Sequence, residues 1–309
     1  MKTKHFVVAG VAIALIAGCK KETHSGATPV NVNNPVRDWC EANMEAAIQS
    51  FTVNATTGGT ITGADGVQIS FVPGAFLTAG GLPVTGIVAI ELVEALGVPE
   101  MILFNKQALG YDGADLKPLV SGGQINLTIS QGGQPLKLVD NGTLVDSPAA
   151  APDPAKAAFY GSEDGTGNVT WDPAPSDVLM LPDSSALFQF FNDSTGWINC
   201  DYFYDPVGTN TAVTITAPSG YDQSNTMVFL VFSSINSIAS LPNFTGGSFT
   251  TSPYYQLPVG MNISIVALSV IGGSYSSSIT TATVAVGMNV PLTFTPTTPA
   301  QFELDVQGL

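Results

Sequence analysis

The sequence has 309 residues and a formal net charge of −15, with nine Lys and Arg against 24 Asp and Glu. Such an acidic chain repels nucleic acid and offers few cations for a nucleotide phosphate, so neither partner is expected. Its two histidines, His5 and His24, both precede residue 35. Histidine-dependent triads and His-rich zinc sites are therefore excluded from the rest of the chain. We expect no metal, no other cofactor and no enzymatic activity.

The first 18 residues have the pattern of an export signal. Lys2 and Lys4 precede an apolar run, Phe6–Ala17, that is shorter than the roughly 20 residues of a membrane-spanning helix. The run ends in Ile16-Ala17-Gly18-Cys19, which resembles the bacterial lipobox, where a small residue precedes a cysteine that becomes lipidated. We therefore expect residues 1–18 to be removed and Cys19 to anchor the chain through its acyl chains.

Residues 19–35 are polar and rich in Thr, Ser, Gly, Asn and Pro, a composition typical of a flexible tether. A coil of this length spans about 20–25 Å. The Cys19-Lys20-Lys21-Glu22 sequence resembles lipoproteins of the Bacteroidetes, some of which use a short charged stretch here for export to the cell surface. The resemblance implies an outer-membrane protein, and both the periplasmic and the outward orientation stay open.

The rest of the chain has the composition of an all-β protein, with 32 Gly, 21 Pro and few charged residues. Residues 36–149 are expected to form a first β-sandwich-like domain that begins with a short helix, Arg37–Gln49. Apolar and polar residues alternate in Gly66–Phe71 and in Gly123–Ser130, which predicts strands. Gly132-Gly133 then predicts a hairpin turn.

A family resemblance supports this domain. Gly58–Phe76, GGTITGADGVQISFVPGAF, resembles a ZU5-type β-sandwich, whose second strand leads into a Pro-Gly-Ala corner. The resemblance implies a protein-binding module. Some ZU5 domains cleave themselves at His-Phe-Ser, but the corresponding strand here has Ile69-Ser70-Phe71, so self-cleavage is not expected. Three further stretches resemble uncharacterised Bacteroidetes lipoproteins: Pro83–Glu94, Leu119–Ile129 and Gly196–Asp205.

Residues 150–185 are rich in Pro and Ala and are expected to link two domains. Asp153-Pro154 predicts a short helical turn through Tyr160, and Trp171 is expected to cover a sheet edge or an interdomain seam. Tyr255–Val270, YQLPVGMNISIVALSV, resembles the Leu-Pro-x-Gly entry into a strand of Ig-like or carboxypeptidase-regulatory-like sandwiches. The resemblance implies such a sandwich over residues 186–309, with a binding or spacing role. Within them the apolar run Met227–Phe232 predicts a central strand.

Several side chains are candidates for chemistry or binding. Cys40 and Cys200 either form a disulfide, which would pin the segment after the tether to the second half, or are two separate buried thiols. Trp197, Tyr202 and Tyr204 are candidates for a glycan-binding platform, with core packing as the alternative.

Two turn-like stretches complete the candidates. Asp193-Ser194-Thr195 resembles the short O-glycosylation sequence of Bacteroidetes, with Ser194 in its centre. Glu163, Asp164, Asn168 and Asp172 supply oxygen atoms in one stretch, but their spacing does not match a calcium-binding EF-hand loop, and a solvated turn is expected.

Three functions follow from these observations. The first is a lipid-anchored outer-membrane lipoprotein that acts as a non-catalytic protein-binding or assembly module of an envelope complex, for example by accepting a strand at a sheet edge. The second is a surface glycan-binding lipoprotein. The third is a carboxylate-dependent glycoside hydrolase, the only common hydrolytic scheme that needs no histidine.

Overall fold

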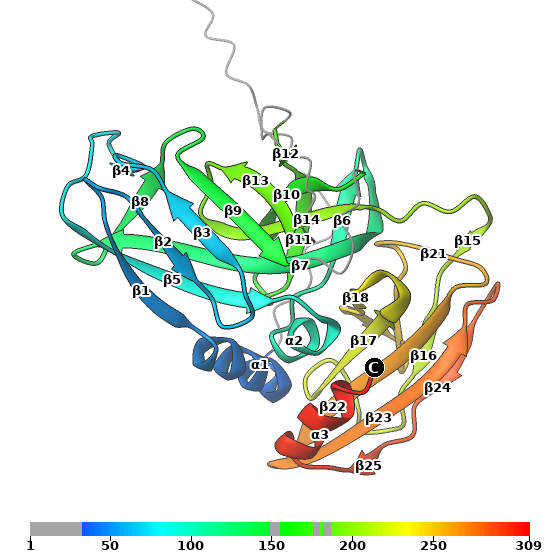
Figure 1. Ribbon diagram of the computed structural model, residues 1–309. Helices are drawn as coiled ribbons and strands as arrows, with labels where there is room; N and C mark the ends of the chain where they lie inside the picture. Colours follow the sequence, from blue (N-terminus) through cyan, green and yellow to red (C-terminus); the bar gives the residue numbers. More distant parts are fainter. Residues whose placement is uncertain (1–32, 149–154, 176–179, 182–186) are drawn as a thin grey trace, which may run out of the picture.

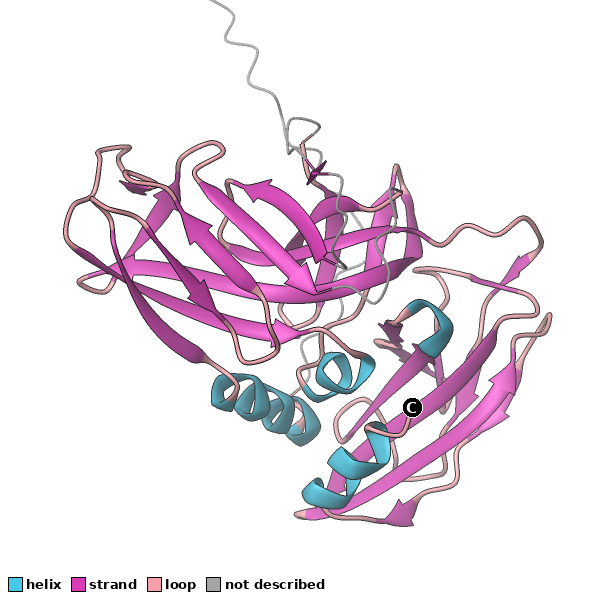
Figure 2. Ribbon diagram, in the orientation of Figure 1, coloured by secondary structure: helices cyan, strands magenta, loops and turns pink. Residues whose placement is uncertain are grey.

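The computed structural model describes residues 33–148, 155–175, 180–181 and 187–309 (Figure 1). About 52% of the described residues are strand and 11% are helix, so the predicted all-β fold is confirmed (Figure 2). The predicted signal peptide, residues 1–18, lies outside the described residues, as do Cys19 and nearly all of the tether. No described helix has the length and apolarity needed to cross a bilayer.

The first half of the molecule consists of two packed sheets. The larger sheet has the order β1 (Gln49–Asn54), β5 (Ile87–Ala95), β7 (Asp115–Gln131), β14 (Gly196–Phe203), β10 (Ala157–Glu163), β11 (Val169–Pro173), β6 (Leu109–Asp112), with β8 (Gln134–Leu138) beside β7 and β4 (Phe76–Thr78) beside β8. The second sheet has the order β12 (Met180–Leu181), β13 (Leu187–Asn192), β9 (Thr143–Pro148), β3 (Gln68–Phe71), β2 (Gly59–Thr62). Alternate apolar residues of both sheets, such as Ile90 and Ile69, meet in one core.

The second half is also sandwich-like. One sheet has the order β18 (Ser237–Ser240), β17 (Thr226–Phe232), β22 (Asn262–Ile271), β23 (Ser274–Thr283), β25 (Thr295–Pro296). The facing sheet has the order β19 (Asn243–Thr245), β20 (Ser248–Thr250), β16 (Thr214–Thr216), β24 (Asn289–Pro291), and β15 (Asn210–Thr211) pairs with β21 (Leu257–Pro258). As predicted, the apolar run of β17 lies centrally between two strands, and a 3-10 turn, η1 (Ser233–Ile235), follows it. Gly272 and Gly273, with φ of 57° and 80°, form the tight turn that joins β22 to β23.

Three helices fill the seam between the halves: α1 (Pro35–Ala46), α2 (Val98–Leu103) and α3 (Pro299–Val306) (Figure 1). Their apolar side chains share one buried cluster with residues of β17 and β22, such as Phe229 and Leu268. A helix forms where the sequence predicted one at 37–49, but it spans Pro35–Ala46. It begins earlier because Asn34 caps it and Pro35 occupies its first turn, and it ends earlier, since Gln49 already belongs to β1. The shared cluster joins the two halves by a continuous apolar contact.

The boundary between the halves lies later in the chain than the sequence predicted. Strands β10 and β11 come from the expected linker, 150–185, yet β10 pairs with β14 inside the larger sheet. β13 and β14, expected in the second domain, pair with β9 and β7 of the first half. The expected helical turn through Tyr160 is also corrected, since residues 157–163 form β10. The proline-rich segments of this region predicted connections. The residues between them form strands, which the composition of the region did not indicate.

Candidate binding surface

The two cysteines are free, buried thiols in separate apolar clusters, so the disulfide that the sequence allowed is absent. Cys40 packs in the seam, and its thiol lies 3.8 Å from the carbonyl oxygen of Ile102. Cys200 packs between the sheets of the first half. Burial raises the pKa of both thiols to about 12, which keeps them protonated and unreactive.

The three candidate glycan-binding aromatics do not form one exposed platform. Trp197 is 4% exposed, because its ring packs in the seam and its indole N–H donates to Glu163 Oε2 at 3.1 Å. Tyr202 and Tyr204 are half-buried. Of the three predicted aromatics, Trp197, the largest, is therefore not available to a ligand. Trp171, in contrast, lies in the seam as expected and donates from Nε1 to the Gln107 carbonyl at 2.8 Å.

Buried polar contacts connect Trp197 to Lys106, which follows α2, and to the turn between β10 and β11. Lys106 is 1% exposed; its ammonium group lies 3.2 Å from Glu163 Oε1, donates to the Gly167 carbonyl and sits 5.2 Å from the Trp197 ring centroid. Burial lowers the pKa of Lys106, whereas the Glu163 carboxylate opposes that effect. The contacts offset the cost of burying the Lys106 charge and fix the position of the Trp197 ring.

The acidic stretch 163–172 has protein donors on its oxygen atoms. Asp164 Oδ1 accepts from Thr166 N at 2.7 Å and from Thr166 Oγ1 at 2.6 Å, which closes the turn between β10 and β11. Asn168 is buried and donates to Ser240 Oγ at 2.6 Å, across the seam. Among the described residues, no group of three or more His, Cys, Asp or Glu could hold a metal ion. The stretch therefore closes a turn and joins the halves.

Ser194 lies in the turn between β13 and β14 and is partly exposed. Asn192 Oδ1 accepts from Ser194 N at 3.2 Å, and Asp193 accepts from the Tyr160 hydroxyl at 2.6 Å, so the turn has a defined conformation. The Ser194 hydroxyl contacts only its neighbour, the Thr195 carbonyl, at 3.2 Å among the hydrogen bonds of the described residues. This location is compatible with the predicted modification.

A carboxylate pair lies on the surface beside β6. Lys117 Nζ lies 2.8 Å from Asp112 Oδ2 and 2.8 Å from Asp205 Oδ2. The two aspartates are 50% and 60% exposed, and Lys117 bonds to both. The acid of a glycosidase lies in a substrate cleft opposite a second carboxyl group, whereas these two aspartates are exposed and both bind one lysine. This arrangement is that of a surface ion-pair cluster.

The outer edge of β23 is the clearest candidate for binding. β25 pairs with β23 only at Ser276 and Ser277. Further along, Val284 exchanges backbone hydrogen bonds with Gly260 and Met261 on the β22 side, and Tyr275 O accepts from Thr297 N on the other side. Since backbone groups alternate along a strand, odd-numbered residues point away from β22. Ile279, Thr281 and Thr283 therefore direct their N–H and C=O groups outward, and we call these three residues the β23 edge.

The β23 edge has no ladder partner among the described residues, and its three side chains are exposed. Natural sheets protect such edges with charges, proline or bulges. β23 has none of these: it contains no charged residue or proline, and its register with β22 runs without a break over all ten residues. It is also longer than the other strands at sheet edges, of which β1 has six residues.

A groove adjoins the β23 edge on one face of the sheet. Its volume is about 680 Å³. The wall contributed by the first half is Tyr204, whose backbone N–H donates to the Pro118 carbonyl at 2.9 Å. Six further lining residues carry hydroxyl or amide side chains, and four are apolar. The first group is Ser233, Ser234, Asn262, Ser264, Thr281 and Thr283, and the second is Val231, Met261, Ile263 and Ala282. This Tyr204 groove and the β23 edge share Thr281 and Thr283, so one ligand can contact both.

The sequence carried a signal for this surface that pattern reasoning overlooked. Between Asp222 and Glu303 the chain has no Asp, Glu, Lys, Arg or His, although the whole chain is strongly acidic. The hairpin of β22 and β23 lies in the middle of this segment. The absence of charge from a strand rich in Ser and Thr is the property that distinguishes a strand-accepting edge from a protected one.

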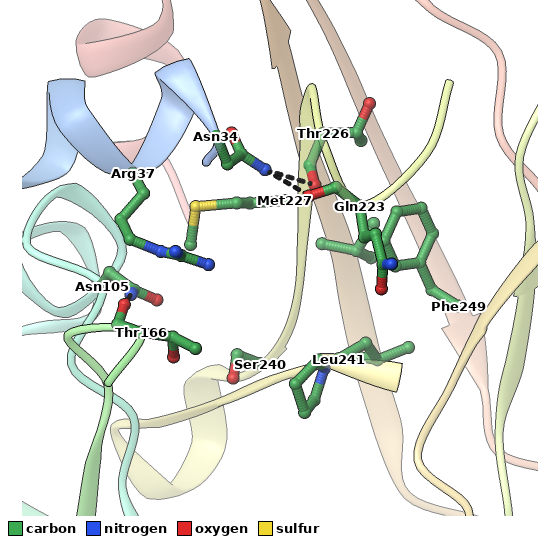
Figure 3. A pocket seen from close by; sticks show the side chains of 12 residues that line it. Asn34, Arg37, Asn105, Thr166, Gln223, Thr226, Met227, Ser240, Leu241 and Phe249 are labelled. Carbon is green, nitrogen blue, oxygen red and sulfur yellow. Dashed lines mark hydrogen bonds between the residues drawn. The ribbon is translucent and has the colours of Figure 1, made fainter. Parts of the chain in front are cut away.

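A second pocket lies in the seam (Figure 3). It measures about 50 Å³, room for a few water molecules. Arg37 and Asn105 line one side, Leu241 and Phe249 line the other, and the Met227 side chain extends towards Arg37. Asn34 donates from Nδ2 across its upper side to the carbonyl groups of Gln223 and Thr226, at 3.0 and 3.1 Å. The hydrogen bonds make it part of the junction between the halves.

Comparison of the sequence with protein-family models and with curated proteins finds no match to either. The resemblances to ZU5-type and Ig-like sandwiches therefore rest on the short motifs described above.

Proposed function

We propose that this protein is a lipid-anchored outer-membrane lipoprotein that acts as a non-catalytic protein-binding or assembly module of the cell envelope. The anchor is Cys19, in the sequence Ile16-Ala17-Gly18-Cys19, and residues 19–35 are the tether. The binding site is the β23 edge, which accepts an extended strand of a partner. The resemblance to ZU5-type and Ig-like modules, which bind or space other proteins, is consistent with this role.

The unpaired β23 edge carries the proposal. Three consecutive outward-facing residues, Ile279, Thr281 and Thr283, leave their backbone donors and acceptors open. An added strand gains main-chain hydrogen bonds along them, and alternate side chains of that strand reach the same face as the Tyr204 groove. The hydrogen bonds supply affinity and the groove supplies specificity. No acid–base pair or nucleophile takes part.

Two substitutions at one position test the binding mode. Thr281→Pro removes an outward N–H group and blocks strand addition, while an edge strand tolerates proline where its N–H faces solvent. Thr281→Val keeps the N–H group and changes only the hydroxyl. Both variants of the full-length protein would be crosslinked in outer membranes, purified and compared by mass spectrometry with wild type and with Cys19→Ala.

The proposal expects a stoichiometric partner that is recovered with wild type and Thr281→Val and lost with Thr281→Pro and Cys19→Ala. Recovery of the same partner with Thr281→Pro, in a variant whose melting temperature is unchanged, would contradict binding at the β23 edge. A hydrolytic activity that one carboxylate substitution abolishes would contradict the non-catalytic role.

Glycan binding is the second candidate, and the Tyr204 groove favours it. A groove lined by a tyrosine together with hydroxyl and amide groups suits a sugar, whose apolar face stacks on aromatics and whose hydroxyls form hydrogen bonds. In this candidate the aromatic contact is Tyr204 alone, in place of the platform of Trp197, Tyr202 and Tyr204 that the sequence suggested. A glycan array with wild type and Tyr204→Ala separates the candidates: a sugar bound only by wild type favours this function, and an array without binding rejects it.

A further inference from the structure

We propose that the strand added to the β23 edge is β23 of a second copy of this chain, paired antiparallel about a two-fold axis that passes beside Thr281. This inference deepens the proposed function and rests on it. In the resulting dimer the five-stranded sheets of two molecules become one continuous sheet. The dimer is the assembly unit that the membrane anchor displays.

The register follows from the residues that are open. In an antiparallel pair of identical strands, the numbers of the two residues in every opposed pair add up to the same sum. Only residues whose backbone groups point outward form hydrogen bonds with the added strand. Centring on Thr281 pairs Thr281 with itself and Ile279 with Thr283, so every open residue meets an open residue. Centring one residue earlier pairs Thr283 with Ser277, which β25 already occupies. Centring one residue later pairs Ile279 with Ala285, beyond the end of β23.

Charge favours a second copy at this edge over the edges of the first half. The chain has a net charge of −15, so two copies repel one another across most approaches. β1 lies beside β5, which carries Glu91 opposite Ser50, and the turn after β2 carries Asp65. β23 and the strands next to it carry no charge at all, because the segment between Asp222 and Glu303 has none. Strand addition through β23 brings no carboxylates of β17, β22 or β23 together.

The side chains also suit self-pairing. Thr281 faces Thr281 of the partner, and threonine pairs across antiparallel strands are among the favourable combinations. Ile279, which is 38% exposed, lies opposite Thr283 and covers apolar surface that water contacts in the monomer. β-branched residues at these positions favour the extended conformation that the pairing needs.

The contact is small, which makes the anchor necessary. Three hydrogen-bonded residue pairs bury much less than the roughly 1,600 Å² of a typical stable interface, so dilute protein stays monomeric. Tethering two copies to one membrane raises their effective concentration, and association then needs little intrinsic affinity. Dimerisation is therefore expected on membranes and not in dilute solution.

A cysteine at the two-fold axis tests the register directly. The two Thr281 residues form a hydrogen-bonded pair in this register, and the Cα atoms of such a pair are about 5.5 Å apart, within the range of a disulfide. Full-length Thr281→Cys in outer membranes should form a disulfide-linked homodimer as its main species after mild oxidation. Thr283→Cys should not, since residue 283 faces residue 279, but co-expressed Ile279→Cys and Thr283→Cys should. Ile271→Cys, exposed at the β22–β23 turn, controls for random collision.

The outcomes separate this inference from the proposed function. A Thr281→Cys homodimer that exceeds the Ile271→Cys level, with Thr283→Cys at that control level, supports the two-fold pairing. No homodimer from a Thr281→Cys protein with an unchanged melting temperature overturns it. If the cysteine instead links to a different envelope protein, the second copy is wrong and strand addition at β23 still holds. If Thr281→Pro also leaves every partner bound, both proposals fail.

Discussion

Asn34 Nδ2 lies 3.1 Å from the carbonyl oxygen of Thr226, a residue 192 positions later in the chain. The same side chain accepts from Val36 N at 2.8 Å and so caps α1. One buried amide therefore joins the end of the tether, the first helix and the second half. The sequence allowed a Cys40–Cys200 disulfide to make this connection, but both thiols are free and Cys200 lies in β14 of the first half. Hydrogen bonds and the apolar packing of α1 join the second half instead.

Replacing Asn34 is expected to weaken the junction. Asn34→Ala removes the helix cap and leaves the buried carbonyl of Thr226 without this donor, which together cost about 1–3 kcal/mol of unfolding free energy. Urea unfolding followed by tryptophan fluorescence measures the loss. Asn33→Ala, at the exposed neighbouring position, is the control and should change stability little. Equal stabilities for the two variants would show that Asn34 does not hold the junction.

The buried ion pair of Lys106 and Glu163 gives an asymmetric prediction. Glu163→Gln leaves the Lys106 ammonium buried without its carboxylate and should cost about 1–3 kcal/mol. Lys106→Met removes the buried charge, keeps much of the side-chain volume and leaves Glu163, which is 42% exposed, able to reach water. It should therefore destabilise less than Glu163→Gln. Chemical denaturation of both variants checks the order, and the reverse order would contradict this account of the pair.

Asp201 should make stability depend on pH. Burial raises the pKa of Asp201 from 3.8 to about 7, although Lys156 and the Gly122 N–H, 3.0 Å away, act in the opposite direction. Between about pH 4 and 7 the folded protein holds a proton that the unfolded chain has released. Stability from this group is thus present in full below about pH 4 and falls as pH rises towards 7, by up to about 1.4 kcal/mol per unit.

The comparison with Asp201→Asn isolates that effect, because asparagine does not titrate. From pH 4.5 to pH 7 the unfolding free energy of wild type relative to Asp201→Asn should decline by about 2–3 kcal/mol. Parallel profiles for wild type and Asp201→Asn would mean that Asp201 is ionised throughout.

The cysteines should be inert while the protein is folded. Because burial raises the pKa of Cys40 and Cys200 to about 12, iodoacetamide at pH 8 should modify neither in the native protein and both after unfolding. Peptide mapping by mass spectrometry reports each site separately. A peptide pair that contains Cys40 linked to Cys200 would restore the disulfide that the structure lacks.

Local patterns predicted the class of fold and several of its elements, but not how the chain divides. The period-two run of residues 66–71 and the apolar run of β17 gave strands in the expected places, and the Asn34-Pro35 sequence explains where α1 begins. β14, in contrast, pairs with β7 some 75 residues earlier. The alternation of apolar and polar residues within a strand does not identify the strand that it pairs with. The predicted boundary between the two halves was therefore too early in the chain.

The binding surface, too, is only partly predictable from the sequence. The residue types of β23 and the absence of charge around it are legible in the sequence. Which of its backbone groups stay open depends on β25 pairing with only Ser276 and Ser277, a contact that no local pattern encodes. Trp197 was a candidate for an exposed binding residue but is buried in the seam. Its position depends on contacts with Lys106 and Glu163, which come from other parts of the chain.

Amide hydrogen exchange of β23 tests strand addition most directly. In dilute purified protein the amides of Ile279, Thr281 and Thr283 should exchange quickly, whereas those of Thr280 and Ala282, which face β22, should be protected. In outer membranes that contain the full-length protein, an added strand should protect all five. Equally fast exchange of the three outward amides in membranes and in dilute solution would show that nothing adds to β23.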